Sequence, residues 1–322
     1  MSGSADSSSK FDLAIIIVNY KTPLLVIDCL ETLIPQAAQL SSQIVVVDND
    51  SADDSLLQLE KWVENNDAQS LVRVLPSGRN GGFSYGNNVG IRAVEADFYL
   101  LLNSDTLVRP QALSKFMDAA AQFPRAGLIG PRLEWPDGEG QISRFRRHSP
   151  LSELIDSAAT GVVTRLLNGF NVPLPLSSEV TKSDWVSFAC VLIRKQVLDQ
   201  VGLMDEGYFM YYEDVDFCLS AKRAGWEVIN FPDAHIVHLR GGSSSVKSDV
   251  SQRKRLPKYY YESRTRYFRK NFGRSGYVIA NLAWSVGWMI AILRRLLGKK
   301  ALHICERQWL DIWTKPRPTQ KK

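Results

Sequence analysis

The sequence has few cysteines and lacks the motifs that would assign a function directly. Its four cysteines form no C-x-x-C pair, so neither a zinc cluster nor a disulfide framework is indicated, and we expect four buried thiols. It meets neither the G-x-G-x-x-G dinucleotide fingerprint nor the Walker A motif. The chain opens without the apolar run of a secretory signal, and we expect residues 1–10 to form a disordered tail.

Acidic residues are scarce at the C-terminal end. Residues 253–322 hold 18 Lys or Arg and 3 Asp or Glu, whereas residues 1–252 hold 21 and 31. A basic end on an acidic body indicates an anionic partner, with lipid and nucleic acid as the usual candidates. Trp284 and Trp288 of this end lie in an apolar segment rather than among the basic residues, so we expect no nucleic-acid partner.

The first half of the sequence alternates strand-like and helix-like segments. Apolar runs predict strands at 13–18, 43–47, 71–75, 98–102 and 127–130, and the segments between them predict helices at 23–33, 53–65, 84–96 and 110–122. This alternation favours an α/β fold with a mostly parallel, twisted, Rossmann-like sheet flanked by helices. Ligands of such sheets bind beyond the carboxyl ends of the strands. Polar residues stand there in this sequence, namely Asn19, Asp48, Asn80 and Asp105.

The second half is less regular. We expect mainly loops over residues 131–183, with a short helix near 154–167. A strand at 185–194, helices to 201 and within 211–225, and short strands at 228–231 and 234–238 follow, and then a flexible glycine-serine loop at 241–245.

A basic helical extension is predicted over residues 253–322. Residues 258–271 mix tyrosine with arginine at helical spacing, and the 17 residues 277–293 carry no charge. That length is short of the ~20 apolar residues of a spanning helix. We therefore expect a helical hairpin that either lies in a membrane interface or packs on the rest of the protein.

Several acidic residues are candidates for chemistry. Asp105 follows a buried strand and suits Mg²⁺ or Mn²⁺, although it also fits a helix-capping role. Asp48 could accept a hydrogen bond from a base or ribose, or could belong to a turn. Glu213, Asp214 and Asp216 suit the first turn of a helix by charge alone, but the aromatic run before them would raise a carboxyl pKa toward that of a general base.

Two further features are open to more than one interpretation. The glycines and amides of residues 78–88 open a helix, and a helix N-terminus with close backbone access suits an anion. His235 and His238 lie three residues apart on a predicted strand and so face opposite sides, which leaves at most one of them for a given metal ion. A lone histidine is equally consistent with a structural role.

Six segments occur in a specific order over residues 12–245: Ile17-Val18-Asn19-Tyr20, Val47-Asp48-Asn49, Asn80-x-Gly82-Phe83, Leu102-Asn103-Ser104-Asp105, Phe209-x-Tyr211-x-Glu213-Asp214-Val215-Asp216 and His238-x-x-Gly241-Gly242-Ser243. Together they resemble family 2 glycosyltransferases of the GT-A fold, and among these the bacterial rhamnosyltransferases that use dTDP-rhamnose. The resemblance departs at Asn103, which replaces the first acid of the D-x-D metal motif, and at Phe188, where relatives often have glycine.

The resemblance implies an inverting glycosyltransferase. A sugar would pass from a dTDP- or UDP-linked donor to a hydroxyl of a saccharide or lipid-linked saccharide. It implies Asp214 as the catalytic base, Asp105 and His238 as ligands of Mg²⁺ or Mn²⁺, and donor contacts from Val18, Asn19, Asp48, Asn80, Gly82, Phe83, Asn87, Asn103, Ser104 and Arg240.

The resemblance also divides the chain and suggests its location. Residues 11–135 would form the nucleotide-sugar half and residues 136–252 the acceptor and catalytic half of one domain. We expect a cytoplasmic protein at the inner face of the membrane, held there peripherally. A nucleotidyltransferase and a non-catalytic nucleotide-sugar-binding protein are the alternatives, but the first would want a basic, glycine-rich motif that residues 17–21 do not supply.

Overall fold

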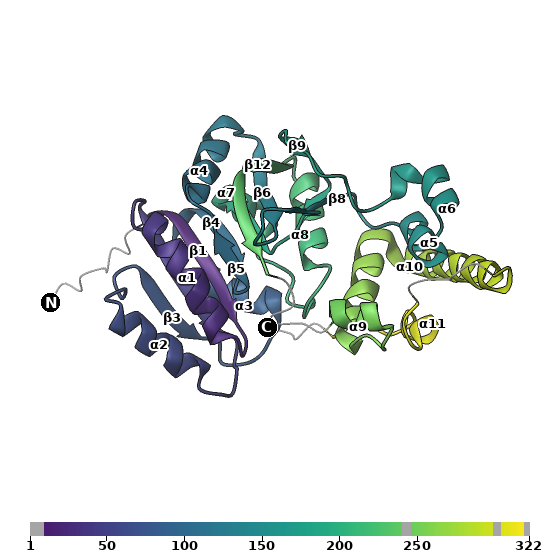
Figure 1. Ribbon diagram of the computed structural model, residues 1–322, viewed down its shortest axis with the longest axis horizontal. Helices are drawn as coiled ribbons and strands as arrows, with labels where there is room; N and C mark the ends of the chain where they lie inside the picture. Colours follow the sequence, from purple (N-terminus) through teal and green to yellow (C-terminus); the bar gives the residue numbers. More distant parts are fainter. Residues whose placement is uncertain (1–9, 240–245, 299–303, 319–322) are drawn as a thin grey trace.

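The computed structural model describes residues 10–239, 246–298 and 304–318. Its centre is a sheet of ten described strands in the order β3-β2-β1-β4-β11-β6-β12-β5, with β7 on β6 and β9 on β12; β8 and β10 form a separate pair (Figure 1). The strands are β1 Phe11–Asn19, β2 Ser42–Asp48, β3 Val72–Pro76, β4 Ala96–Asn103, β5 Thr106–Val108, β6 Ala126–Glu134, β7 Gly140–Gln141, β8 Arg144–Phe145, β9 Thr181–Lys182, β10 Trp185–Val186, β11 Cys190–Arg194 and β12 Glu227–His238.

Helices cover both faces of this sheet. The helices that flank the sheet are α1 Pro23–Ala37, α2 Ser55–Asn65, α3 Phe83–Arg92, α4 Ala112–Gln122, α7 Lys195–Val201 and α8 Glu213–Arg223. Alternate residues of β1 divide between two cores: Ile15 and Ile17 pack with α1, α2 and α4, whereas Ile16 packs with α3, α7 and α8. Burial on both faces explains why β1 is a continuous apolar run.

The predicted parallel order is confirmed for β3, β2, β1 and β4, and β6 and β12 form a further parallel pair. The sheet as a whole is mixed, because β11 runs antiparallel between β4 and β6, and β5 runs antiparallel to β12. The single strand expected at 185–194 is two strands, since residues 187–189 leave the ladder. Conversely, the two short strands expected near the end form one strand, β12, with an irregular register after Phe231.

Other boundaries also differ from expectation. The helix expected to reach residue 96 ends at Arg92, because the fully buried Ala96 begins β4. The irregular region contains α5 Pro150–Ala158, α6 Gly161–Leu166 and the short 3₁₀ helix η1 Asn168–Phe170. All four cysteines are free and buried, as expected. The predicted tail at residues 1–9 and the loop at 241–245 lie outside the described residues.

The C-terminal extension contains α9 Val246–Gln252, α10 Lys258–Leu296 and α11 Gln308–Asp311. The helix α10 is broken at Gly273, whose φ of 72° is not helical. Arg264 Nη1 nevertheless donates a 2.7 Å hydrogen bond to Asn281 Oδ1 across that break. A straight helix would separate these residues by about 25 Å. The chain therefore folds back at Gly273 into the predicted hairpin, with a first arm before this residue and a returning arm after it.

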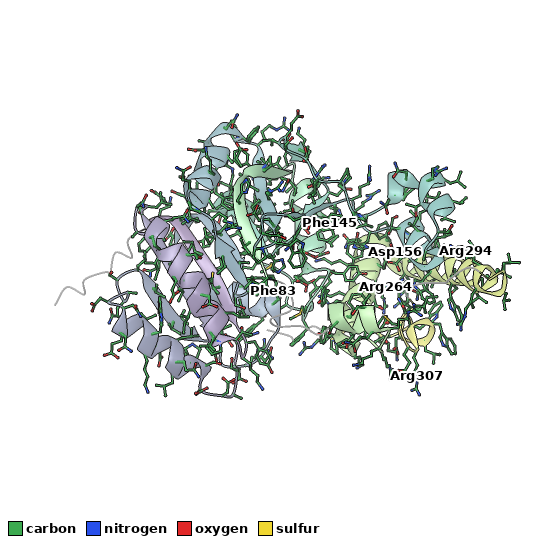
Figure 2. All side chains as sticks on the ribbon, in the orientation of Figure 1. Phe83, Phe145, Asp156, Arg264, Arg294 and Arg307 are labelled. Carbon is green, nitrogen blue, oxygen red and sulfur yellow. The ribbon has the colours of Figure 1, made fainter. Side chains whose placement is uncertain are left out.

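The hairpin packs on α5 through a buried ion pair and a close helix contact. Arg264 donates two hydrogen bonds to Glu153 Oε2, at 2.7 and 3.0 Å, and both side chains are buried. On the returning arm, a β-carbon added to Gly287 would lie 2.1 Å from Ser157 Oγ and 2.5 Å from the Leu154 carbonyl oxygen. Figure 2 labels Arg264 among these helices.

Substitution of Gly287 tests this packing. Gly287→Ala should lower the free energy of unfolding by about 1–3 kcal/mol, because the added methyl group forces α10 away from the backbone of α5. Gly161→Ala is the control, since a β-carbon there meets nothing within 4 Å. Urea unfolding of both variants measures the difference, and equal stabilities would contradict the close contact.

Candidate active site

A cavity of about 510 Å³ opens beyond the carboxyl ends of β1, β2 and β4. This is where a sheet of this kind binds ligands, and the volume suits a small organic molecule. Most of the residues singled out in the sequence line it: Val18, Asn80, Gly82, Phe83, Asn103, Ser104, Asp105, Asp214 and His238.

Three candidate donor residues do not reach the cavity lining. Asn19 donates a 2.7 Å hydrogen bond to Asp48 Oδ1, and Ser51 donates to the same carboxylate from its hydroxyl and its backbone N–H. Asn87 donates to the Phe83 carbonyl oxygen within α3. Asn19 and Asp48 thus join the loop that follows β1 to the loop that follows β2. Arg240 lies outside the described residues.

An amide network shapes the glycine turn before α3. Asn49 Nδ2 donates to Asn80 Oδ1 at 3.3 Å and to the Gly82 carbonyl oxygen at 3.2 Å. Asn80 Oδ1 in turn accepts the Gly82 N–H at 3.2 Å. Asn49 was not singled out as a site residue, although it stands beside Asp48 in a quoted motif. The network presents the N-terminus of α3 to the cavity.

This turn is locked to the segment before α8. The Phe83 N–H donates a 2.7 Å hydrogen bond to the Phe209 carbonyl oxygen. Gly82 has a φ of 87° and a ψ of −173°, a combination that essentially only glycine adopts. A β-carbon there would lie 2.0 Å from the Phe209 carbonyl oxygen. Gly82 is therefore required by both its conformation and its surroundings.

The segment that leads into α8 is itself strained. Tyr211 and Tyr212 both adopt left-handed backbone conformations, with φ of 70° and 67°. Each such residue costs about 1–2 kcal/mol, and strain of this kind concentrates at functional sites. The sharp turn places Glu213 and Asp214 at the first turn of α8, where both side chains line the cavity.

These two adjacent carboxyl groups differ in their surroundings. Burial raises the pKa of Asp214 to about 7, while hydrogen bonds from the backbone of Val215 and Phe188 oppose that rise. Burial, with the neighbouring Asp214 charge, raises the pKa of Glu213 well above its ordinary value. Glu213 Oε2 has no hydrogen-bond partner among the described residues. The surroundings of Glu213 thus favour its neutral form, and the carboxylate form of Asp214 is able to accept a proton.

Asp105 and His238 come together through pairing of β5 with β12. His238 pairs with Thr106, and its Nε2 lies 3.5 Å from Asp105 Oδ1; both side chains are buried. His238 Nδ1 has no hydrogen-bond partner among the described residues. His235 lies on the opposite face of β12 from His238, as the alternation of side chains along a strand predicts. Its Nδ1 lies 3.0 Å from Glu134 Oε2.

These two groups fit a hard cation only in part. Within the described residues, no cluster of three or more His, Cys, Asp or Glu side chains could hold a metal ion. Asp105 offers one carboxylate and His238 offers one imidazole. Mg²⁺ commonly completes its coordination sphere with phosphate oxygens of the substrate. The pair therefore suits an ion that binds together with a diphosphate.

Several lining residues were not chosen from the sequence, among them Tyr20, Ser187, Met210, Tyr211 and Tyr259. Tyr20 and Tyr211 lie within the segments that resemble the family, and this position could have marked them as site residues. Tyr259 comes from the first arm of α10, and nothing in its local sequence links it to a site. Figure 2 shows Phe83, another lining residue, in the central part of the molecule.

Comparison with known proteins identifies the family. The sequence pattern described as "Glycosyl transferase family 2" matches residues 14–202. The chain belongs to this family. It is therefore a glycosyltransferase, and neither a nucleotidyltransferase nor a non-catalytic binding protein.

Relatives and solved structures agree with this assignment. An N-acetylglucosaminyl-diphospho-decaprenol L-rhamnosyltransferase of Mycobacterium tuberculosis is 27% identical over 75% of this chain and 80% of its own length. The low-salt glycan biosynthesis hexosyltransferase Agl10 of Haloferax volcanii is 28% identical over 91% of this chain and 87% of its own length. A mannosyltransferase of Pyrobaculum calidifontis, solved with GDP-Man and Mn²⁺, has a TM-score of 0.57 at 12% identity, covering 91% of this chain and 77% of its own. The fold is GT-A-like.

Gly82→Ala should disrupt the active site more than it disrupts the fold. The added methyl group must displace the Phe209 carbonyl, and a misplacement of about 1 Å lowers rates roughly 100-fold. Gly78→Ala is the matched control, because Gly78 also has a positive φ, of 79°, but a β-carbon there meets nothing within 4 Å. Measured kcat/KM should fall steeply only in the Gly82 variant, while Gly78→Ala shows only the strain of about 1–2 kcal/mol in stability.

Proposed function

We propose that this glycosyltransferase is an inverting enzyme that transfers a sugar to a hydroxyl of a saccharide or lipid-linked saccharide. Its first candidate donor is dTDP-rhamnose. The observation that carries the proposal is the Asp214 carboxyl group, which lines the same cavity as Asp105 and His238 and has a pKa raised to about 7. A general base works best with a pKa near the operating pH.

The proposed reaction is a single displacement. Asp214 accepts the proton of the acceptor hydroxyl as its oxygen forms a bond to the anomeric carbon. The bond from that carbon to the diphosphate oxygen breaks, and the nucleoside diphosphate leaves. Because attack and departure occur on opposite faces, the anomeric configuration inverts. Hydrogen bonds from the backbone of Val215 and Phe188 hold the Asp214 carboxylate in place.

Asp105, His238 and the N-terminus of α3, which also line the cavity, suit the leaving group. Asp105 and His238 would hold a divalent cation, Mg²⁺ or Mn²⁺, and a bound cation of this kind supplies charge neutralisation for a departing diphosphate. The N-terminus of α3, which begins at Phe83, supplies backbone N–H groups and a favourable dipole for an anion. Mn²⁺ in the solved mannosyltransferase supports this proposal.

The donor and acceptor are inferred from the relatives. The Mycobacterium tuberculosis protein is by name a rhamnosyltransferase that acts on a lipid-linked sugar. Its alignment spans most of both chains, which supports rhamnose and a lipid-linked acceptor. UDP-linked sugars are the alternative donors. The Haloferax volcanii relative is by name a hexosyltransferase and is consistent with either class.

Replacement of Asp214 tests the assignment of the base. Asp214→Asn should lower transfer about 10²–10⁴-fold, since an amide cannot accept the proton, while donor affinity persists. Glu213→Gln should lose much less, because burial favours the neutral form of Glu213 and an amide has a similar shape and no charge. For the unsubstituted protein, kcat/KM should rise as the pH increases through about 7, where the carboxyl group loses its proton. A flat profile between pH 5.5 and 8, or turnover retained in Asp214→Asn, would contradict the assignment.

Donor choice and metal dependence can be measured together. A panel of dTDP- and UDP-sugars is scored by the shift in melting temperature, with Mn²⁺, Mg²⁺ or a chelator. We expect the largest shift with dTDP-rhamnose and a divalent ion, because a ligand that binds only the folded state raises its stability. Asp105→Asn should remove the ion-dependent part of the shift. Equal shifts with and without ion would argue against a metal at Asp105.

A further inference from the structure

The returning arm of α10 carries an exposed apolar stripe. Eight large apolar side chains on it, and Leu297 directly after it, are 39–80% exposed; they recur at intervals of one, three or four residues, which places them along one side of the helix. They are Val278, Ile279, Leu282, Val286, Met289, Ile292, Leu293, Leu296 and Leu297. Figure 1 shows this end of α10, in yellow-green, projecting away from the sheet.

The opposite side of the same arm is buried against protein. Ala280, Trp284, Gly287 and Ala291 are buried, and Gly287 meets the backbone of α5. The close packing of Gly287 on α5 fixes the rotation of the arm about its own axis. The apolar stripe, on the opposite side, therefore points away from the protein. By length and composition, α10 is the one described helix that could cross a membrane. Its break at Gly273 and its protein-covered side instead suit a helix that lies in the plane of an interface.

Tryptophan side chains from α11 and its flank extend the stripe. Trp309 and Trp313 are 48% and 45% exposed, and Trp309 stacks on Trp288 with ring centroids 6.3 Å apart. This segment is anchored to α10, because Asn281 and Tyr277 both donate to the Ile312 carbonyl oxygen. Tryptophan is enriched where lipid tails meet headgroups. We call the nine residues 278–297 named above, together with Trp309, Leu310 and Trp313, the apolar face.

The charges around the apolar face select its occupant. Residues 274–305, which include the returning arm, contain five Lys or Arg and no Asp or Glu. Arg274 and Arg295, one at each end of the returning arm, are exposed. A second copy of the chain, related by two-fold symmetry, would set these like charges against one another. An anionic lipid surface complements both the apolar side chains and the cations.

We propose that the apolar face inserts into the headgroup region of an anionic bilayer and holds the enzyme at the membrane surface. The hairpin connects this face to the cavity. Tyr259 of the first arm lines the cavity, and Ser263 Oγ donates a 3.0 Å hydrogen bond to the Met210 carbonyl oxygen in the cavity wall. Binding therefore sets the position of the active site relative to the lipid. The membrane contact does not depend on the identity of the sugar or of the acceptor.

Co-sedimentation of the full chain with vesicles tests the proposal. The full chain should bind vesicles of phosphatidylglycerol and phosphatidylcholine, bind pure phosphatidylcholine weakly, and lose affinity as salt rises. Leu282→Glu with Met289→Glu should weaken binding roughly tenfold or more, because two charges enter the inserted face. The matched control is Leu24→Glu with Leu57→Glu, which charges two exposed leucines on α1 and α2 and should bind as the unsubstituted chain does.

Further measurements separate the alternatives. Both double variants should keep the melting temperature and the nucleotide-sugar affinity of the unsubstituted chain, so a failed glycosyltransferase assignment would leave the vesicle result intact. Three results would overturn the proposal. One is equal vesicle binding by both double variants. Another is self-association that only Leu282→Glu with Met289→Glu abolishes, without vesicle binding. The third is membrane attachment that resists alkaline carbonate, which would indicate a spanning helix.

Discussion

The active site depends on one backbone contact, the hydrogen bond from the Phe83 N–H to the Phe209 carbonyl oxygen. This contact joins the glycine turn at the cavity to the segment that leads into Glu213 and Asp214. It can form only because residue 82 has no β-carbon and adopts a backbone conformation closed to other residues. The strained pair Tyr211 and Tyr212 follows directly, so one contact and one sharp turn set the distance across the cavity.

Within that frame, two neighbouring carboxyl groups acquire different properties. Glu213 is buried, and its Oε2 meets no hydrogen-bond partner in the described part of the chain, so its neutral form is favoured. Burial also raises the pKa of Asp214, but backbone hydrogen bonds to its carboxylate oppose the rise, which reaches only about 7. The difference between their pKa values follows a general rule. Environments that move the pKa values of two neighbouring groups apart give those groups different chemical roles. Asp105 and His238, paired by β5 and β12, complete the polar lining.

The C-terminal hairpin links this site to a surface of different chemistry. The buried pair of Arg264 with Glu153 holds the hairpin to α5, and removal of one partner of such a pair costs about 3–5 kcal/mol. The same hairpin contributes Tyr259 to the cavity and presents apolar side chains outward. The sequence left two alternatives for residues 277–293, packing on the protein or exposure at a surface. The returning arm does both, because one side of the helix packs on α5 and the opposite side is exposed.

Local sequence determined the elements that depend on local forces. The buried parallel strands β1 to β4, the helices between them and the hairpin break were all visible in apolar runs and periodicity, and the motif order indicated the family. Three features were decided only by the tertiary structure. The strand β11 inserts antiparallel beside β4, and Tyr259 lines the cavity. Asn19 and Asp48 bond to each other and do not line it. Strand partners and cavity linings arise from contacts between residues distant in the chain. No pattern in a short segment records which distant backbone will lie beside it.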